Sequence, residues 1–335
     1  MQILEAYCEE LDRVVDIYEA REEFIALPLE SRRRFTFRCS DVRCRISRKP
    51  QVLVSGVNYD KVVEETERYV QPHYRALNNH PHLDDCVWVV GERKRQKAEP
   101  VDPQEPHGRT PRAKGSDFVD FFDPPEFDTP SGSVSAPVPN SIEKPESEEE
   151  PGHQRGPRDH GGVTTTSKLE RFIDCWAQLD VEARKQEHIT LNKGERVTYY
   201  QAVLPIRLVE PHENGARVVC GGARVKLWPQ DKPKFAYINF IDACERFELN
   251  QEARTLTIEL PLSRVDRFRG GALMRQRLEK ATARGHYLRM YVWGVITPHP
   301  KRPGYLLEVA ALDNLVLKVI KSKAAVNQQL AAQEE

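Results

Sequence analysis

The sequence predicts an α+β protein with two folded parts joined by a long linker. Cysteine and histidine residues crowd into residues 39–86, proline recurs from residue 100 to residue 157, and short apolar segments follow from residue 167 onwards. These observations predict a small N-terminal module over residues 1–90 and a disordered linker over residues 91–166. A strand-rich, OB-like barrel over residues 167–321 and a flexible tail over residues 322–335 are predicted to follow.

The N-terminal module is predicted to contain short strands and one helix. Apolar residues alternate with acids from Leu11 to Leu27, which favours a hairpin, or a short strand followed by a helical turn. Apolar runs at Phe35–Arg38 and Gln51–Val54 predict two strands. Asn58 is a suitable N-cap for a helix from about residue 59 to residue 69.

The linker contains one segment, residues 117–127, in which acids alternate with phenylalanines. Such a segment within a disordered region is typical of a docking motif that becomes ordered on a protein partner. The alternative is that it folds back on its own chain.

The second folded part begins with a clear helix signal. Thr166 or Ser167 is the predicted cap of a helix over residues 168–179, and Ser167 with Glu170 forms the pattern of a capping box. Apolar runs then predict strands, with one helix inserted over residues 271–284. The predicted strands cover residues 217–220, 223–228, 235–241, 255–260, 288–296 and 305–320. Such an array suits a small closed or partly open barrel.

The charges are balanced overall but locally segregated. The chain of 335 residues has 50 Lys and Arg against 51 Asp and Glu. Residues 32–49 carry eight basic side chains against the single acid Asp41, and residues 264–289 carry eight against two. Local fields of this kind favour polyanion binding.

Neither a membrane span nor a signal peptide is expected. No apolar run approaches the roughly 20 residues that a span requires, and the N-terminus lacks a basic and apolar leader. We therefore predict a cytoplasmic protein with reduced thiols, whose seven cysteines serve metal binding and ordinary burial.

Four residues form two compact pairs, Cys39-x4-Cys44 and His82-x3-Cys86, separated by an insert of 37 residues. Thiolates and imidazole in this number suit a tetrahedral, structural zinc site with no open position for catalysis. His73 and His80 compete with His82 as the fourth ligand. The alternative is that the cysteines are simply buried small hydrophobic residues.

The basic segment beside the first cysteine pair predicts a nucleic-acid-binding surface, with single-stranded or branched DNA as the partner. Arginines contact phosphates, and exposed aromatic rings stack on bases. The candidate residues are Arg32, Arg33, Arg34, Phe35, Phe37, Arg38, Arg43, Arg45 and Arg48. In the second part, Tyr199, Tyr200, Trp228, Tyr237, Tyr291 and Trp293 lie on or near predicted strands, although aromatic residues on strands are usually core.

The N-terminal motifs resemble a known family. The order of Phe37-Arg38-Cys39 with Cys44, Pro72-His73-Tyr74-Arg75, His82 and Cys86 is similar to the N-terminal region of CoiA-like competence proteins. The resemblance covers residues 1–90 and implies that Cys39, Cys44, His82 and Cys86 are zinc ligands and that the context is DNA uptake and recombination. The Asp…Glu-x-Lys signature of the family's nuclease-like domain does not occur in residues 167–320.

No motif indicates a catalytic centre, and we expect a nucleic-acid-binding accessory protein. Two other functions stay open: a protein–protein adaptor in a DNA-processing or defence complex, and a divergent metal-dependent nuclease.

Overall fold

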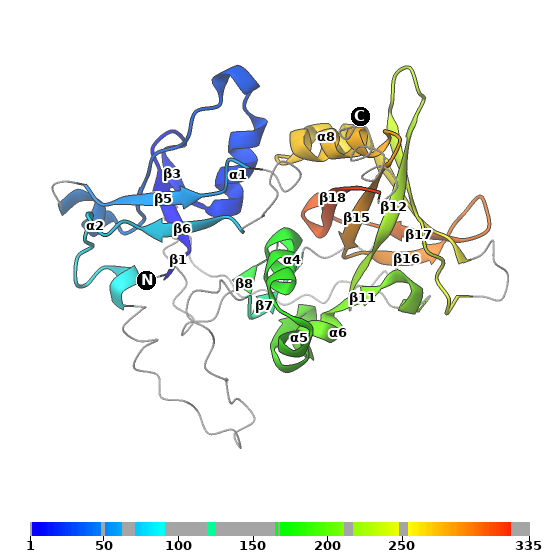
Figure 1. The fold of residues 1–335 in the computed structure, drawn as a ribbon, viewed down its shortest axis with the longest axis horizontal. Coiled ribbons are helices and arrows are strands. Elements are labelled where there is room, and N and C mark those ends of the chain that lie inside the picture. The colour runs from blue at the N-terminus through cyan, green and yellow to red at the C-terminus, as the bar shows by residue number, and fades with distance from the viewer. Residues whose placement is uncertain are drawn as a thin grey trace, which may run out of the picture.

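The computed structural model describes residues 2–47, 51–61, 71–90, 119–124, 165–166, 168–210, 217–247 and 254–322. Helices and strands both occur in this part of the chain, and the strands form three sheets (Figure 1). The predicted mixture of helix and sheet is confirmed. None of the described helices is long and apolar enough to cross a membrane.

The N-terminal module is built on a six-stranded antiparallel sheet with the order β1-β6-β5-β4-β2-β3. Its strands are β1 (Gln2–Ile3), β2 (Glu5–Cys8), β3 (Arg13–Asp16), β4 (Phe37–Cys39), β5 (Leu53–Val57) and β6 (His73–Ala76). Its helices are α1 (Ile17–Ala26), the 3-10 turn η1 (Leu29–Ser31) and α2 (Val42–Ser47). Of the helix predicted over residues 59–69, residues 62–69 lie outside the described residues.

Helix α1 begins at a capping box. The side chain of Asp16 accepts from the backbone N–H groups of Tyr18 and Glu19 at 2.8 and 2.9 Å, and Glu19 accepts from the Asp16 N–H at 3.1 Å. These bonds satisfy donors that a helix start leaves unpaired. The strand-then-helix alternative for residues 11–27 is therefore the one that forms, with a helix of 10 residues.

Part of the predicted linker belongs to a folded sheet. β7 (Phe121–Phe122) pairs in parallel with β8 (Thr165–Thr166) and with β9 (His188–Leu191). Val119 and Phe122 are buried, and Phe122 stacks on Phe172 with ring centroids 5.3 Å apart. For residues 119–124, the segment thus folds back on its own chain. The rest of residues 117–127 lies outside the described residues.

Helix α4 (Leu169–Gln178) occupies the predicted position, but its start differs from the prediction. Its N-cap is Lys168, which makes no side-chain capping bond, and Ser167 lies outside the described residues. Glu170 pairs with the buried Arg21 of α1 at 3.2 Å. Thr166, the other predicted cap, accepts from the Lys168 N–H through its Oγ1 atom at 3.1 Å, and the capping box of Ser167 with Glu170 stays a prediction.

The second part contains an eight-stranded sheet with the order β16-β17-β14-β13-β12-β15-β18, in which β11 also pairs with β12. The strands are β11 (Val203–Pro205), β12 (Val218–Trp228), β13 (Phe235–Phe240), β14 (Leu256–Pro261), β15 (His286–Val292), β16 (Val295–Pro298), β17 (Tyr305–Glu308) and β18 (Leu315–Lys321). The remaining elements are α5 (Val181–Gln186), η3 (Asn192–Gly194), β10 (Glu195–Thr198), α6 (Tyr199–Ala202), η4 (Ile206–Leu208), α7 (Leu262–Arg267), α8 (Gly271–Ala281) and η6 (Leu312–Asn314).

The predicted OB-like barrel does not close. Among the described residues, β16 and β18 lie at opposite ends of the strand order with no ladder between them. The strand β12 has 11 residues and is shared by three neighbours, because it pairs with β11 and β15 near its start and with β13 near its end. The sheet therefore branches at β12 and stays open, with β16 and β18 as its end strands among the described residues. The strands predicted over 288–296 and 305–320 are each interrupted, giving β15 and β16, and β17 and β18.

The two faces of the large sheet are covered by different helices. Met274 and Leu278 of α8 pack with Leu288 and Met290 of β15 in one core. On the opposite face, α4 and the small sheet pack against Cys220, Tyr291 and Val316. The part of the sheet near the β12–β13 turn projects beyond this packing (Figure 1).

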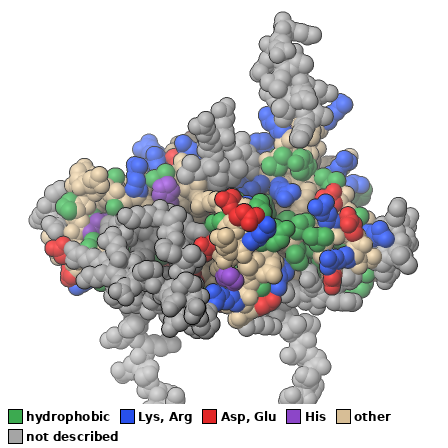
Figure 2. All heavy atoms as spheres, turned by 60° about the horizontal axis from the view of Figure 1, so that its bottom comes forward, with side chains coloured by type: hydrophobic (Ala, Val, Ile, Leu, Met, Phe, Trp, Pro, Cys, Tyr) green, Lys and Arg blue, Asp and Glu red, His purple; other side chains and the backbone are tan. Residues whose placement is uncertain are grey.

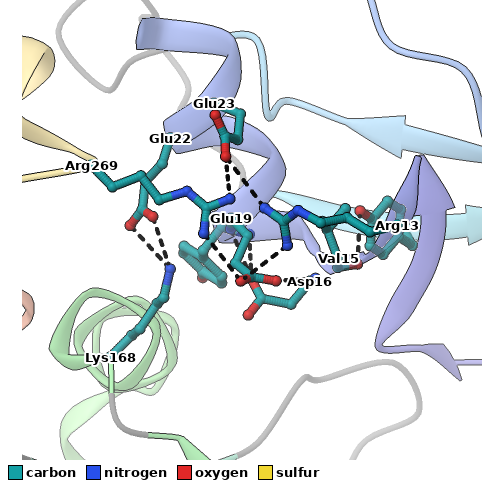
Figure 3. A network of polar contacts seen from close by, with 10 residues as sticks. Arg13, Val15, Asp16, Glu19, Glu22, Glu23, Lys168 and Arg269 are labelled. Carbon is teal, nitrogen blue, oxygen red and sulfur yellow. Dashed lines mark hydrogen bonds and ion pairs between the residues drawn. The ribbon is translucent and has the colours of Figure 1, made fainter. Parts of the chain in front are cut away.

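Charged side chains join the N-terminal module to the second part of the chain. Arg269, just before α8, forms ion pairs with Glu19 and Glu23 of α1, and Arg13 binds the same two carboxylates (Figure 3). Helix α1 therefore presents an acidic surface to basic residues of the second part.

Candidate metal centre

Three separate segments of the N-terminal module bring the four predicted ligands together. Cys39 ends the strand β4, Cys44 lies in α2, and His82 and Cys86 lie in the segment that precedes the helical residues 87–90. The pairing of β4 with β2 and β5 fixes the position of Cys39 within the sheet.

Asp41 holds the two ligand segments against each other. One carboxylate oxygen accepts from the backbone N–H groups of Arg43 and Cys44, at 3.0 and 3.4 Å, and the other accepts from the Val87 N–H at 3.2 Å. Partial burial opposes ionisation, but these three N–H groups together lower the pKa of Asp41. Asp41 is a positioning residue that the sequence reasoning missed, because an isolated acid in a basic run gives no signal of this role.

The four ligand atoms form one compact group. The Sγ atoms of Cys39 and Cys86 are 3.6 Å apart, and the Nδ1 atom of His82 lies 3.6 Å from Cys44 Sγ and 3.4 Å from Cys86 Sγ. All four atoms lie within 4.8 Å of one another. The group could hold a metal ion.

The group is closed to solvent. The side chains of Cys39, Cys44 and Cys86 have no exposed surface, and the Nε2 atom of His82 is enclosed. Around them, the backbone N–H of Leu83 points to Cys44 Sγ at 3.4 Å. A fully enclosed set of four ligands is the arrangement of structural sites and not of catalytic ones.

The protonation of the three thiols is uneven. The pKa of Cys86 is lowered because the Cys39 thiol and His82 donate hydrogen bonds that favour its thiolate, although burial opposes ionisation. The pKa of Cys39 is raised by the same hydrogen bond to Cys86 and by burial, and burial raises the pKa of Cys44. The site therefore already favours one thiolate ligand.

The two competing histidines lie elsewhere. The Nδ1 atom of His73 is 3.0 Å from the Gln71 carbonyl oxygen, and that of His80 is 2.8 Å from the Gln51 carbonyl oxygen. Both rings are thus engaged by backbone, and the compact group contains His82 as the prediction preferred. All seven cysteines are buried without disulfides, but the group contains only three of them.

Three of the predicted phosphate-binding arginines are engaged within the module. The guanidinium of Arg32 donates to two backbone carbonyls near the C-terminus of α1, at 3.0 and 2.7 Å. Arg38 forms an ion pair with Glu9. Arg45 lies over the ring of Tyr7, 3.9 Å from its centroid.

Two further arginines are paired but stay at the surface. Arg34 lies 3.4 Å from Asp60, and Arg43 lies 3.4 Å from Asp41 and 2.9 Å from Asp85. The side chains of Arg34 and Arg43 are each 62% exposed, so guanidinium N–H groups remain available to solvent.

The predicted stacking rings belong to an aromatic cluster of the module. Phe37 is 3% exposed, and Phe35 stacks on Tyr59 with ring centroids 5.8 Å apart. Phe37 is therefore not available as a stacking platform, and Phe35 is half-buried with one face against Tyr59. Arg33 is exposed, whereas Arg48 lies outside the described residues.

Comparison with protein-family models, with curated proteins and with solved structures finds no match for this chain.

Proposed function

We propose that this chain is a DNA-binding accessory protein whose N-terminal module is stabilised by a structural zinc ion. The observation that carries the proposal is the enclosed group of Cys39, Cys44, His82 and Cys86. Three thiolates and one imidazole are ligands that Zn²⁺ prefers, and they are poor ligands for Mg²⁺ or Ca²⁺.

The spacing of the ligand atoms supports zinc. With metal–sulfur distances of about 2.3 Å and metal–nitrogen distances of about 2.0–2.1 Å, neighbouring ligand atoms of a zinc tetrahedron lie roughly 3.6–3.8 Å apart. The three separations of 3.4 to 3.6 Å between Sγ and Nδ1 atoms are close to these values.

A zinc ion here would cross-link the sheet to the segment around residues 82–86. In structural sites the free energy of metal binding is folding free energy. The ion would therefore maintain the surface that the module presents.

Basic side chains on that surface support DNA as the partner. Arg33, Arg34 and Arg43 reach solvent on the module that contains the metal group, and phosphate contacts need only part of a guanidinium. The resemblance of residues 1–90 to CoiA-like competence proteins favours the same partner.

Metal analysis tests the zinc proposal. Purified wild-type protein should contain one zinc ion per chain, and Cys39→Ser and His82→Ala should both lose it. Cys8→Ser and His80→Ala are matched controls, because Cys8 is equally buried and His80 is nearby, yet neither belongs to the group. Wild-type protein without zinc, or controls that lose it, would contradict the proposal.

Salt dependence tests the DNA proposal. If the module contacts phosphates, log Kd for single-stranded DNA should rise with log salt by about 0.7 for each phosphate contacted. The double variant Arg33→Gln/Arg34→Gln should lower this slope while keeping its zinc. A flat salt dependence of the wild type would refute phosphate-driven binding.

A further inference from the structure

The outer face of the β12–β13 hairpin exposes large aromatic rings that the fold does not use. Trp228 is 51% exposed and Phe235 is 39% exposed, and the two residues are directly opposite each other in the antiparallel ladder. By contrast, Tyr199, Tyr291 and Trp293, three other aromatic residues of this part, are buried.

The alternation of side chains along the hairpin separates a core face from this outer face. Val225, Leu227, Ala236 and Ile238 pack into or against the core on one side. The residues between them point the other way, because neighbouring side chains in a strand alternate. We call these outer residues the hairpin face: Arg224, Lys226 and Trp228 on β12, with Phe235 and Tyr237 on β13.

The hairpin face combines positive charge with ring surfaces. Lys226 Nζ lies 5.5 Å from the centroid of the Trp228 ring and is paired across the ladder with Tyr237. The rings of Phe235 and Tyr237 are stacked with centroids 6.3 Å apart and planes at 29°. The cations thus lie on β12, beside Trp228 and directly across the ladder from the ring of Tyr237.

Charge around the hairpin face is mainly positive. Lys232 and Lys234 are exposed in the turn, which also holds the acid Asp231. The acid next to Tyr237 on the adjoining strand is Glu259, which is paired with His299 at 3.1 Å. Figure 2 shows Lys and Arg side chains among hydrophobic ones, with Asp and Glu side chains between them, over the half of the molecule that carries the large sheet.

We propose that the hairpin face is a binding site for single-stranded nucleic acid, with Trp228 and Phe235 stacking on bases and Arg224 and Lys226 contacting phosphates. Aromatic rings give every base a stacking surface, and the cations beside them follow the backbone. The pairing of rings with neighbouring cations matches the pairing of bases with neighbouring phosphates along a single strand, which favours nucleic acid as the occupant. The proposal deepens the DNA-binding function proposed above, rests on it, and places its main contacts on the second part of the chain.

Fluorescence anisotropy with short labelled oligothymidylate and oligouridylate tests this site on the full chain. Trp228→Ala and Phe235→Ala should each weaken binding roughly 5- to 100-fold, and Trp228→Phe should restore most of the affinity. Lys226→Gln should lower the salt slope by about 0.7. Tyr200→Ala is the matched control, because Tyr200 is 55% exposed but lies on α6. A preference between the two oligonucleotides distinguishes DNA from RNA.

Three outcomes separate this site from the general function. If the hairpin variants bind like wild type while Arg33→Gln/Arg34→Gln does not, the hairpin site is wrong and the DNA-binding function stands. If polyglutamate competes as well as the oligonucleotides and loss of the rings has no effect, the face is an acidic-protein site and the proposal is overturned. If wild-type protein binds neither oligonucleotide at low salt, both proposals fail.

Discussion

Lys168, at the start of α4, donates from its Nζ atom to both carboxylate oxygens of Glu22 on α1, at 3.1 and 3.0 Å (Figure 3). The two side chains are only 21% and 19% exposed and join the N-terminal module to the second part of the chain. Burial raises the pKa of Glu22 to about 7, even though Lys168 favours the carboxylate. The module is thus attached through a carboxyl group whose ionisation is unfavourable in the folded protein.

This raised pKa makes the stability of the attachment depend on pH. The unfolded Glu22 carboxyl releases its proton near its ordinary pKa of 4.5, whereas the folded one keeps it until about pH 7. The stabilisation that the protonated Glu22 gives to the folded state is therefore fully present below pH 4.5 and is lost as the pH rises through 7. Between pH 5 and 8, the wild type should lose about 1–3 kcal/mol more free energy of unfolding than Glu22→Gln does, as measured by urea denaturation.

The control for this measurement is Glu182→Gln. Glu182 also pairs with a lysine, Lys185, at 2.9 Å, but it is 74% exposed. Its variant should keep the pH dependence of the wild type. If Glu22→Gln and the wild type lose the same free energy of unfolding between pH 5 and 8, Glu22 is not the source of the pH dependence.

Glu170 is the carboxylate between two buried arginines. Its removal should lower the free energy of unfolding far more than removal of an exposed carboxylate. Its oxygen lies 3.2 Å from Arg21 and 3.9 Å from Arg277, which are 2% and 7% exposed. Burial opposes its ionisation, but these arginines outweigh it, and the pKa of Glu170 is lowered. Glu170→Ala should cost about 3–5 kcal/mol in urea denaturation, because it leaves buried positive charge without its counter-ion.

An exposed pair provides the comparison for Glu170. Glu210 and Arg246 are 2.6 Å apart, yet their side chains are 56% and 52% exposed. Glu210→Ala should change the free energy of unfolding by less than about 1 kcal/mol. Similar losses of unfolding free energy in Glu170→Ala and Glu210→Ala would mean that burial does not determine how much these ion pairs stabilise the fold.

The sequence predicts those parts of the fold that have a local cause. Helices α4 and α8 and strands β13 and β14 follow from apolar periodicity and turn residues within the segments themselves. The grouping of Cys39, Cys44, His82 and Cys86 was also predictable, because short spacing between two ligand pairs is a local pattern.

The features that the sequence does not predict depend on distant partners. Strand β7 is only two residues long and exists because β8 and β9 pair with it on both sides. The arginines of residues 32–49 form a basic run in the sequence, but acids such as Glu9, Asp60 and Asp85 reach them from elsewhere in the module. Charge patterns along one segment do not include these partners, so they overestimate the free basic surface.

If the group holds the proposed zinc ion, its removal should loosen the N-terminal module selectively. The four ligands lie on segments whose sheet contacts are short, so without the cross-link the amides of β4 and β5 should exchange hydrogen faster. The amides of β14 and β15, which belong to a separate core, should be unaffected. Hydrogen exchange before and after treatment with a zinc chelator, followed by added Zn²⁺, measures both effects. Unchanged exchange in β4 and β5 would mean that the ion does not stabilise the module.

Two adjacent glycines in β12 should respond differently to the same substitution, because they face opposite sides of the sheet. A Cβ atom at Gly221 would lie 2.9 Å from Phe240 and 3.1 Å from Ile206, so the core would have to shift. Gly221→Ala should therefore cost about 1–3 kcal/mol. At Gly222 the nearest atoms, on Ile241 and Tyr287, are 3.4 and 3.5 Å away, which is ordinary contact.

Gly222→Ala should leave the free energy of unfolding unchanged or raise it by up to about 1 kcal/mol, since a glycine within a strand loses more conformational entropy on folding. Urea denaturation of the two variants in parallel measures the difference. Because the residues are neighbours in one strand, their backbone surroundings are matched, and the comparison isolates the space available to the new methyl group. Equal destabilisation would indicate that the outer side of β12 is packed as tightly as the core, and Gly222 would then not lie beside an open hairpin face.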